Sequence, residues 1–229
     1  MIQAILFDID GTMTNINTVD FMRNYLGILA PRFAHLISPE RFTKQLIKSM
    51  QVMQSEPKAG QTNMQTFYED FCRAIGQPFQ VLKPIFEEFY ASDFPTLRCL
   101  IQPYAQGVKV IEYSIQQGFL TAIASKPVMP IIAVRKQIRW AGFTPEHFKV
   151  IPALDSFHYC KPHLGFFSEL AESLGVEPKE CLLVSENQED AVCRELGMKH
   201  FFVGTLDEMI TDYSGNLEDL LSLIGQGIL

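Results

Sequence analysis

Two carboxylates one residue apart, Asp8 and Asp10, are the residues whose type and spacing most clearly indicate chemistry. They follow a short apolar run, Ile2 to Phe7, which is typical of a buried strand, and Gly11 then ends that run. Strand alternation sends both carboxylates to the same side. Because neighbouring carboxylates repel each other, the pair indicates either a bound divalent cation or a nucleophile beside a general acid or base.

The pair has two further interpretations. An acidic loop without a function remains an alternative for an isolated Asp-x-Asp pair. An EF-hand calcium loop is excluded, because that loop requires an acidic residue at its fifth position and glycine at its sixth. This sequence has Thr12 and Met13 at those positions.

The surrounding octapeptide, FDIDGTMT, resembles the first motif of the haloacid dehalogenase (HAD) superfamily, in which apolar residues precede Asp-x-Asp-Gly-Thr. The first Asp of that motif is the nucleophile and the second is the acid/base, so the resemblance implies these roles for Asp8 and Asp10. The second Asp is typical of the branch that transfers phosphoryl groups, and the dehalogenases lack it. The resemblance also implies that Thr12 shapes the turn, supports Asp10 and contributes to a phosphate site.

A second phosphate ligand is expected in the sequence IASKP, which follows the second predicted strand. The family has Thr or Ser at this place, and alignment from Gly118 makes Ser125 the corresponding hydroxyl donor. Alignment from Lys126 and Pro127 instead puts Ala124 at that position, so both alignments stay open. A turn residue before a helix is the plain alternative for Ser125.

Lys161 resembles the lysine of a later motif, which precedes proline and contacts both nucleophile and phosphate. Proline is common at the first helical position, so we expect Pro162 to begin a helix and Lys161 to be its N-cap. A lysine at the positive end of a helix is unfavourable unless an anion shares the space. A solvated lysine at a helix start remains the alternative.

The segment SENQED resembles the last motif of the family, in which two acids spaced as Asp-x-x-x-Asp hold Mg²⁺. Here the spacing is kept by Glu186 and Asp190. The resemblance implies a Mg²⁺ site made of Asp8, the main-chain carbonyl of Asp10 and Glu186, with Asp190 behind it. Waters and a substrate phosphate oxygen would complete the coordination. Asp190 could also close a capping box that begins at Asn187.

A long helical segment separates the first predicted strand from the others. Apolar residues recur at helical spacing from Val19 to about Phe89, so we expect helices there and interpret their aromatic and methionine stripes as core. Beyond Pro103, strand and helix patterns alternate. The expected strands are Phe119–Ala124, Lys149–Ile151, Cys181–Val184 and His200–Val203. The expected helices are Gly107–Gln117, Pro127–Trp140, Pro162–Leu174, Gln188–Leu196 and an acidic helix at the end.

This alternation predicts an α/β fold with a Rossmann-like, doubly wound parallel sheet, formed by residues 1–14 and 101–229. Residues 15–100 would form an inserted all-helical subdomain. An insertion at this place is the C1 cap in the HAD family, and this one resembles the phosphoglycolate phosphatase and β-phosphoglucomutase group. The expected hinges lie near Asn15–Thr18 and Arg98–Tyr104, and closure would exclude water from the site.

The composition indicates which kinds of binding partner and which cellular location to expect. The net charge is −7 and no run of Lys or Arg occurs, which argues against nucleic acid or an anionic membrane as partner. No apolar run approaches the length needed to span a bilayer. The 5 scattered cysteines form no Cys-x-x-Cys pair, as expected of reduced thiols in a cytoplasmic protein. We expect a monomer, because the cap must move.

Together these motifs predict a Mg²⁺-dependent phosphomonoester hydrolase that acts on a small phosphorylated metabolite through an aspartyl-phosphate. A phosphosugar mutase of the same family is the second hypothesis. A weakly active or non-catalytic relative that acts by binding is the third, motivated by the altered Ser125 and Glu186 positions. The substrate itself is not assigned by the sequence.

Overall fold

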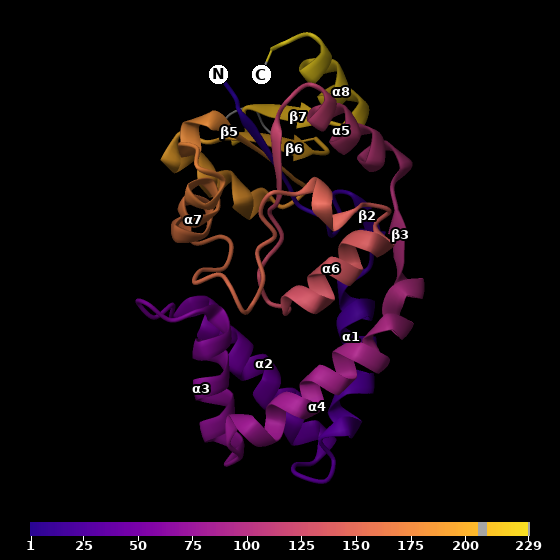
Figure 1. Ribbon diagram of the computed structural model, residues 1–229, viewed down its shortest axis with the longest axis vertical. Coiled ribbons are helices and arrows are strands. Elements are labelled where there is room, and N and C mark those ends of the chain that lie inside the picture. Colours follow the sequence, from indigo (N-terminus) through magenta and orange to yellow (C-terminus); the bar gives the residue numbers. More distant parts are fainter. Residues whose placement is uncertain (206–209, 229) are drawn as a thin grey trace.

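The central element of the fold is a parallel sheet. In the computed structural model, which describes residues 1–205 and 210–228, five strands of the described chain form this sheet in the order β4-β1-β5-β6-β7 (Figure 1). The strands are β1 Ala4–Phe7, β4 Leu120–Ile123, β5 Cys181–Ser185, β6 Lys199–Val203 and β7 Tyr213–Gly215. All four pairings are parallel, so the predicted α/β sheet is confirmed.

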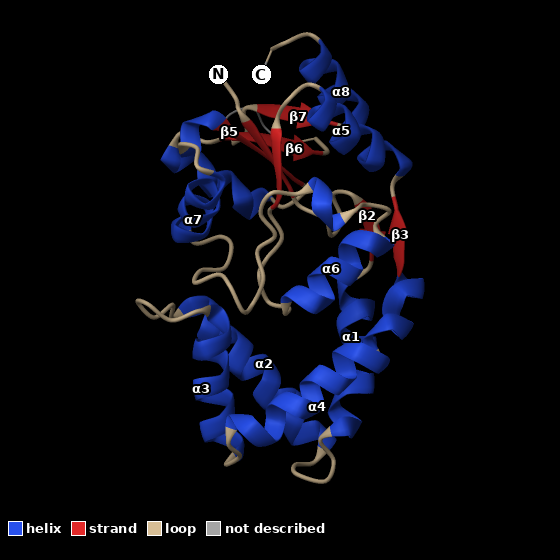
Figure 2. Cartoon of the chain, in the orientation of Figure 1, coloured by secondary structure: helices blue, strands red, loops and turns tan. Residues whose placement is uncertain are grey.

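Alternate residues of β1 point into two cores, one on each face of the sheet. Ile5 and Phe7 belong to the larger core and Ala4 and Leu6 to the smaller one, and all four are fully buried. The larger core includes residues of α5 (Ala105–Gln116), α6 (Ile131–Trp140) and α8 (Leu217–Gly225). The smaller includes residues of α7 (Leu164–Leu174) and the 3-10 helix Gln188–Leu196. Helices lie on both sides of the sheet (Figure 2). Burial on both faces explains why β1 is continuously apolar.

A helical segment is inserted between two short strands, β2 (Thr14–Ile16) and β3 (Ile101–Pro103), which pair antiparallel. The predicted boundaries, at residues 14/15 and 100/101, fall in this two-stranded ribbon. The ribbon joins the helices to the rest of the molecule along one side (Figure 1). The helices are α1 Thr18–Arg32, α2 Pro39–Ser55, α3 Asn63–Ile75, α4 Phe79–Ser92 and the 3-10 helix Phe94–Leu100. We call this segment the cap.

Aromatic side chains form the core of the cap. Phe33 and Phe42 stack with ring centroids 4.4 Å apart, and Phe71 meets Phe42 edge to face at 5.6 Å. Each of these three rings is fully buried. Such offset and edge-to-face pairs are favoured by the ring quadrupoles as well as by burial. The predicted aromatic stripes therefore supply a packed interior for this segment.

Several local elements differ from those expected from the sequence. The strand expected at Lys149–Ile151 is reduced to one bridge between Val150 and Ala122. The helix expected from Pro127 begins only at Ile131, after Pro130 as N-cap. The short strands β2, β3 and β7 were not predicted, because three residues carry too little periodicity.

None of the described helices is both long enough and apolar enough to cross a membrane.

Candidate active site

The predicted catalytic residues meet in a cavity of about 280 Å³ beside the ends of β1 and β4. Asp8, Asp10, Ser125 and Lys161 all line it, and Phe21 and other residues of α1 form part of its cap side. In the sheet, β4 lies on one side of β1 and β5 lies on the other. The direction in which the chain adds strands therefore reverses at β1. A reversal of this kind opens a crevice at the carboxyl ends of the strands, where α/β proteins bind ligands.

Asp8 is held through both of its carboxylate oxygens. Its Oδ1 accepts hydrogen bonds from the hydroxyl of Ser125 at 2.7 Å and from the backbone N–H of Ile9 at 2.9 Å. Its Oδ2 lies 2.8 Å from Nζ of Lys161. Ala124 is fully buried and offers no hydroxyl, so Ser125 is the residue that reaches Asp8. Asp8 is thus oriented by a hydroxyl, a backbone amide and a cation.

Lys161 lies between two carboxylates. Its Nζ is 2.8 Å from Asp8 and 2.7 Å from Asp190, and only 4% of its side chain is exposed. Burial alone would lower the pKa of Lys161, but the charges of Asp8 and Asp190 raise it above its usual value. The ammonium therefore stays protonated, and its charge offsets part of the negative charge of the site.

The helix start predicted at Pro162 was wrong. Helix α7 begins at Leu164 and its N-cap is His163, whose side chain accepts a hydrogen bond from Gly165 N. Lys161 is therefore not an N-cap, and the argument that an anion must offset the helix dipole does not apply to it. Its ion pairs with the two carboxylates explain its position instead.

Asp10 is the second carboxylate of the cavity and makes no close ion pair with Lys161. Burial, and after it the charge of Asp8, raise the pKa of Asp10 to about 7. Glu186 contributes in the same direction, while Lys161 opposes the shift. A carboxyl group in this environment can hold or release a proton near neutral pH, which general acid–base chemistry requires.

Glu186 lies beside the turn that follows β1. Its backbone N–H donates to the hydroxyl of Thr12 at 3.0 Å, and a Cβ added to Gly11 would come 1.7 Å from its carboxylate oxygen. Gly11 has a φ of +76°, so both space and conformation require glycine there. Thr12 is fully buried and joins the loop after β1 to the loop after β5. The phosphate contact of Thr12 stays a prediction.

The donor set fits a hard divalent cation. Asp8, Asp10 and Glu186 are oxygen donors, and Asp8 raises the pKa of each of the other two in addition to burial. This excess negative charge is what a Mg²⁺ ion would offset. The described residues contain no cluster of three or more His, Cys, Asp or Glu arranged to hold a metal alone. The predicted site also uses a main-chain carbonyl and a substrate oxygen, so Mg²⁺ binding stays a prediction.

Asp190 lies against Lys161, away from solvent. It is fully buried and its Oδ2 bonds to Lys161. Its side chain therefore does not close a capping box, although Asn187 is the N-cap of the helix and accepts from Glu189 N. The contact with Lys161 indicates that Asp190 orients that lysine, and direct metal ligation by Asp190 stays a prediction.

Several residues near the site were not found from the sequence. Lys126, Gln137 and Asn187 line the same cavity as Asp8. Lys126 directly follows Ser125, so its position beside a predicted phosphate ligand was the available signal. His200 lies behind the site, with its ring 3.2 Å from the Ser185 hydroxyl, and no local pattern pointed to it.

Comparisons with known proteins agree on one family. A model of haloacid dehalogenase-like hydrolases matches residues 2–192. The pyrophosphatase PpaX of Bacillus cereus (strain AH820) is 20% identical over 191 residues, which cover 83% of this chain and 77% of that protein.

Solved structures show the same fold. A HAD phosphatase from Thermococcus onnurineus superposes with a TM-score of 0.61 at 19% identity, over 98% of each chain. The L-2-haloacid dehalogenase of Xanthobacter autotrophicus, with chloropropionic acid covalently bound, gives 0.59 at 17% identity over 98% of this chain and 99% of that one. A predicted phosphoglycolate phosphatase from Haemophilus somnus gives 0.57 at 17% identity over 97% of each. Both branches, phosphatase and dehalogenase, are therefore among its structural relatives.

Proposed function

We propose that this chain, which belongs to the haloacid dehalogenase-like hydrolases, is a Mg²⁺-dependent phosphatase that hydrolyses phosphate monoesters of small metabolites. The observation that carries the proposal is the presence of Asp10 in the same cavity as Asp8. Phosphoryl transfer needs a proton donor for the leaving oxygen, whereas displacement of a halide does not. The second carboxylate therefore favours the phosphatase branch over the dehalogenase branch.

In the proposed reaction Asp8 is the nucleophile. A carboxylate oxygen of Asp8 forms a bond to phosphorus while the bond from phosphorus to the ester oxygen breaks, which gives an aspartyl-phosphate. Ser125 and Lys161, which hold Asp8 at 2.7 and 2.8 Å, also donate to the phosphoryl oxygens. Positioning and charge stabilisation of this kind supply most of the catalysis of phosphoryl transfer.

Asp10 moves the protons. It gives its proton to the departing alcohol oxygen in the first step, and it accepts a proton from the water that attacks the aspartyl-phosphate in the second. The products are the alcohol and inorganic phosphate, and Asp8 and Asp10 return to their starting states. The cap residue Phe21, which is buried beside this cavity, helps to exclude bulk water.

Asp8, the main-chain carbonyl of Asp10 and Glu186 are the residues that would hold Mg²⁺. Bound there, the ion would supply positive charge that reduces the repulsion between the nucleophile and the phosphate. Asp190 would act through Lys161, which it contacts at 2.7 Å.

The test is phosphate release from a panel of phosphomonoesters, with Mg²⁺ and with a chelator. Wild type should release phosphate only with Mg²⁺, and Asp8→Asn and Asp10→Asn should each lower kcat by at least about a hundredfold. Glu189→Gln, at an exposed carboxylate nearby, is the matched control and should leave kcat unchanged. Absence of release by the folded wild-type protein would overturn the proposal and favour a mutase or a binding protein.

A further inference from the structure

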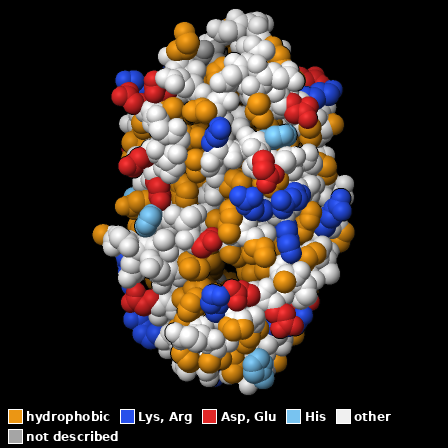
Figure 3. Space-filling view, viewed as in Figure 1, with side chains coloured by type: hydrophobic (Ala, Val, Ile, Leu, Met, Phe, Trp, Pro, Cys, Tyr) orange, Lys and Arg blue, Asp and Glu red, His pale blue; other side chains and the backbone are white. Residues whose placement is uncertain are grey.

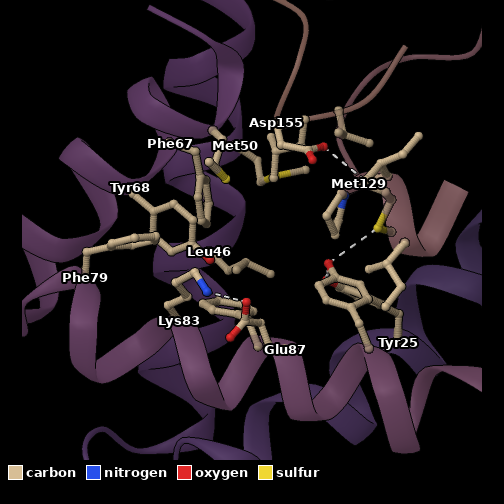
Figure 4. Close-up of a pocket in the computed structure, with 18 of the residues that line it drawn as sticks. Tyr25, Leu46, Met50, Phe67, Tyr68, Phe79, Lys83, Glu87, Met129 and Asp155 are labelled. Atoms are coloured by element: carbon tan, nitrogen blue, oxygen red, sulfur yellow. Dashed lines mark hydrogen bonds and ion pairs between the residues drawn. The ribbon is translucent and has the colours of Figure 1, made fainter. Parts of the chain in front are cut away.

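A large cavity lies between the cap and the α/β part of the molecule. It measures about 750 Å³ and is lined from helices α1 to α4 on one side and from residues near 128–132 and 154–155 on the other. Figure 4 shows aromatic and aliphatic side chains, among them Leu46, Met50 and Phe67, around the open space. A hollow edged by apolar side chains is visible on the face in Figure 3.

This cavity adjoins the active site. Met22 of α1 and Val128 and Met129, in the segment between β4 and α6, line both the large cavity and the cavity that holds Asp8. A molecule whose phosphate lies at Asp8 therefore has a direct neighbouring space for the rest of its structure. The volume falls within the range that small-molecule ligands occupy in proteins.

The cavity does not stay open because the cap lacks apolar residues to fill it. The adjacent core of the cap is tightly packed, with Phe33, Phe42 and Phe71 fully buried and in ring contact. Met50 and Met64 pack against this core with part of their surface, and their half-buried side chains also line the cavity. Methionine side chains are flexible and suit apolar ligands of variable shape. Open apolar clefts of this size mark binding sites.

The charged groups of the lining already have partners. Lys83 and Glu87 form an ion pair with each other, and Asp155 accepts a hydrogen bond from Ile131 N at 3.0 Å. The hydroxyls of Tyr25 and Tyr90 bond to each other at 2.7 Å. The lining thus has no unpaired cation that would select a second anionic group, and burying such a group there would be costly.

We propose that the alcohol part of the substrate carries a large uncharged apolar group, alkyl or aryl, which this cavity binds while the phosphate lies at Asp8. This inference rests on the proposed function and names its substrate class. Highly polar esters such as sugar phosphates should be poorer substrates, because the mostly apolar lining offers their hydroxyls few hydrogen-bonding partners besides Gln51, Gln54 and Tyr68.

A series of n-alkyl phosphates from methyl to octyl, kept below their micelle concentrations, tests the proposal. The value of kcat/KM should rise by up to about fourfold for each added methylene until the cavity is filled. Glucose 6-phosphate should be hydrolysed no faster than methyl phosphate. A kcat/KM that does not change with alkyl chain length, or a preference for glucose 6-phosphate, would overturn the proposal.

Filling the cavity provides the second test. Met50→Trp should lower kcat/KM for octyl phosphate at least about tenfold and leave that for methyl phosphate within about twofold, because only the longer chain needs the space. Met64→Trp fills the cavity from α3 and should act in the same way if Met50→Trp does not fold. Lys48→Trp, exposed on the same helix as Met50, is the control. Equal losses for both substrates would overturn the proposal.

A binding experiment distinguishes failure of this inference from failure of the proposed function. Octylphosphonate, which is not hydrolysed, should bind the wild-type protein at least about tenfold more tightly than methylphosphonate by titration calorimetry, and Met50→Trp should abolish the difference. If this binding is found but no phosphomonoester is hydrolysed, the proposed function fails and the cavity assignment stands. If esters are hydrolysed and both phosphonates bind equally, the cavity assignment fails alone.

Discussion

At the scale of single residues, Lys161 decides the charge balance of the candidate site. Its ammonium lies within 2.8 Å of Asp8 and 2.7 Å of Asp190, and all three side chains are largely removed from solvent. Buried charges are costly unless they are paired. The nucleophile proposed here, Asp8, therefore depends on a neighbour 153 positions away in the sequence.

Lys161→Met should destabilise the protein by about 3–5 kcal/mol, because Asp8 and Asp190 then lose their buried cation. Adding Asp190→Asn removes one of the two uncompensated charges, so the double variant should recover part of that loss. Urea denaturation at neutral pH measures the free energy of unfolding of all three proteins. A double variant less stable than Lys161→Met would show that Asp190 is stabilised by other groups.

Gly11→Ala should cost about 1–3 kcal/mol of folding free energy, for two reasons. The backbone there has a φ of +76°, and the new methyl group would collide with Glu186. Gly27→Ala is the matched control, because Gly27 is exposed in α1 and has no atom within 4 Å of an added Cβ. That change should instead stabilise the protein by up to about 1 kcal/mol. Thermal denaturation of both variants decides between these directions.

At the scale of elements, strands β1, β4 and β5 could be predicted because a buried parallel strand is a continuous apolar run. The register in which β1 pairs with β4 could not be predicted from the sequence. Whether Ser125 or Ala124 reaches Asp8 is settled only once Phe7 is in register with Ile123. The motif around Lys161 implied its contact with Asp8, whereas its place as an N-cap was mispredicted and its contact with Asp190 leaves no trace in local sequence.

His200 links β6 to the end of β5 and should make stability depend on pH. Burial lowers the pKa of His200 from 6.5 to about 4, so the folded protein keeps the ring neutral where the unfolded chain protonates it. Between these two values the unfolded state binds more protons. The free energy of unfolding therefore falls as the pH falls through this window, by about 3 kcal/mol at its lower end, and this group contributes no pH dependence above it.

His200→Gln isolates this contribution, because the variant keeps a polar group near Ser185 but cannot titrate. Its free energy of unfolding should depend less on pH than that of the wild type between pH 6.5 and 4. Carboxylates that titrate in the same range affect both proteins alike, so the difference between the two curves is the quantity to compare. Parallel curves would contradict the prediction.

At the scale of the whole molecule, the cap and the α/β part meet through few polar contacts. The N–H groups of Asn63 and Met64, at the start of α3, each donate at 2.7 Å to the carbonyls of Phe157 and Leu154. Periodicity predicted that the methionines of the cap face inward, but it could not tell that a cavity rather than another side chain lies opposite Met50 and Met64. Which space stays open is decided by how the two parts dock.

Lys136 makes a further contact between the two parts, since its Nζ donates to the carbonyl of Tyr90 at 2.6 Å. Lys136→Met removes this hydrogen bond and should favour the open cap by about 1 kcal/mol, or roughly fivefold. The amides of Asn63 and Met64 exchange with solvent when the cap leaves the α/β part, so their hydrogen exchange should become roughly fivefold faster. Amides inside α7, such as that of Leu170, should not change.

Lys109→Met, at an exposed position of α5, is the control for loss of a lysine charge and should leave the exchange of Asn63 and Met64 unchanged. If Lys136→Met accelerates exchange throughout the molecule, it has lowered global stability instead of releasing the cap. If it leaves Asn63 and Met64 unchanged, these amides do not report cap opening. Selective acceleration would show that the contact of Lys136 with Tyr90 helps to hold the start of α3 against the α/β part, as expected if the cap opens to admit substrate to Asp8.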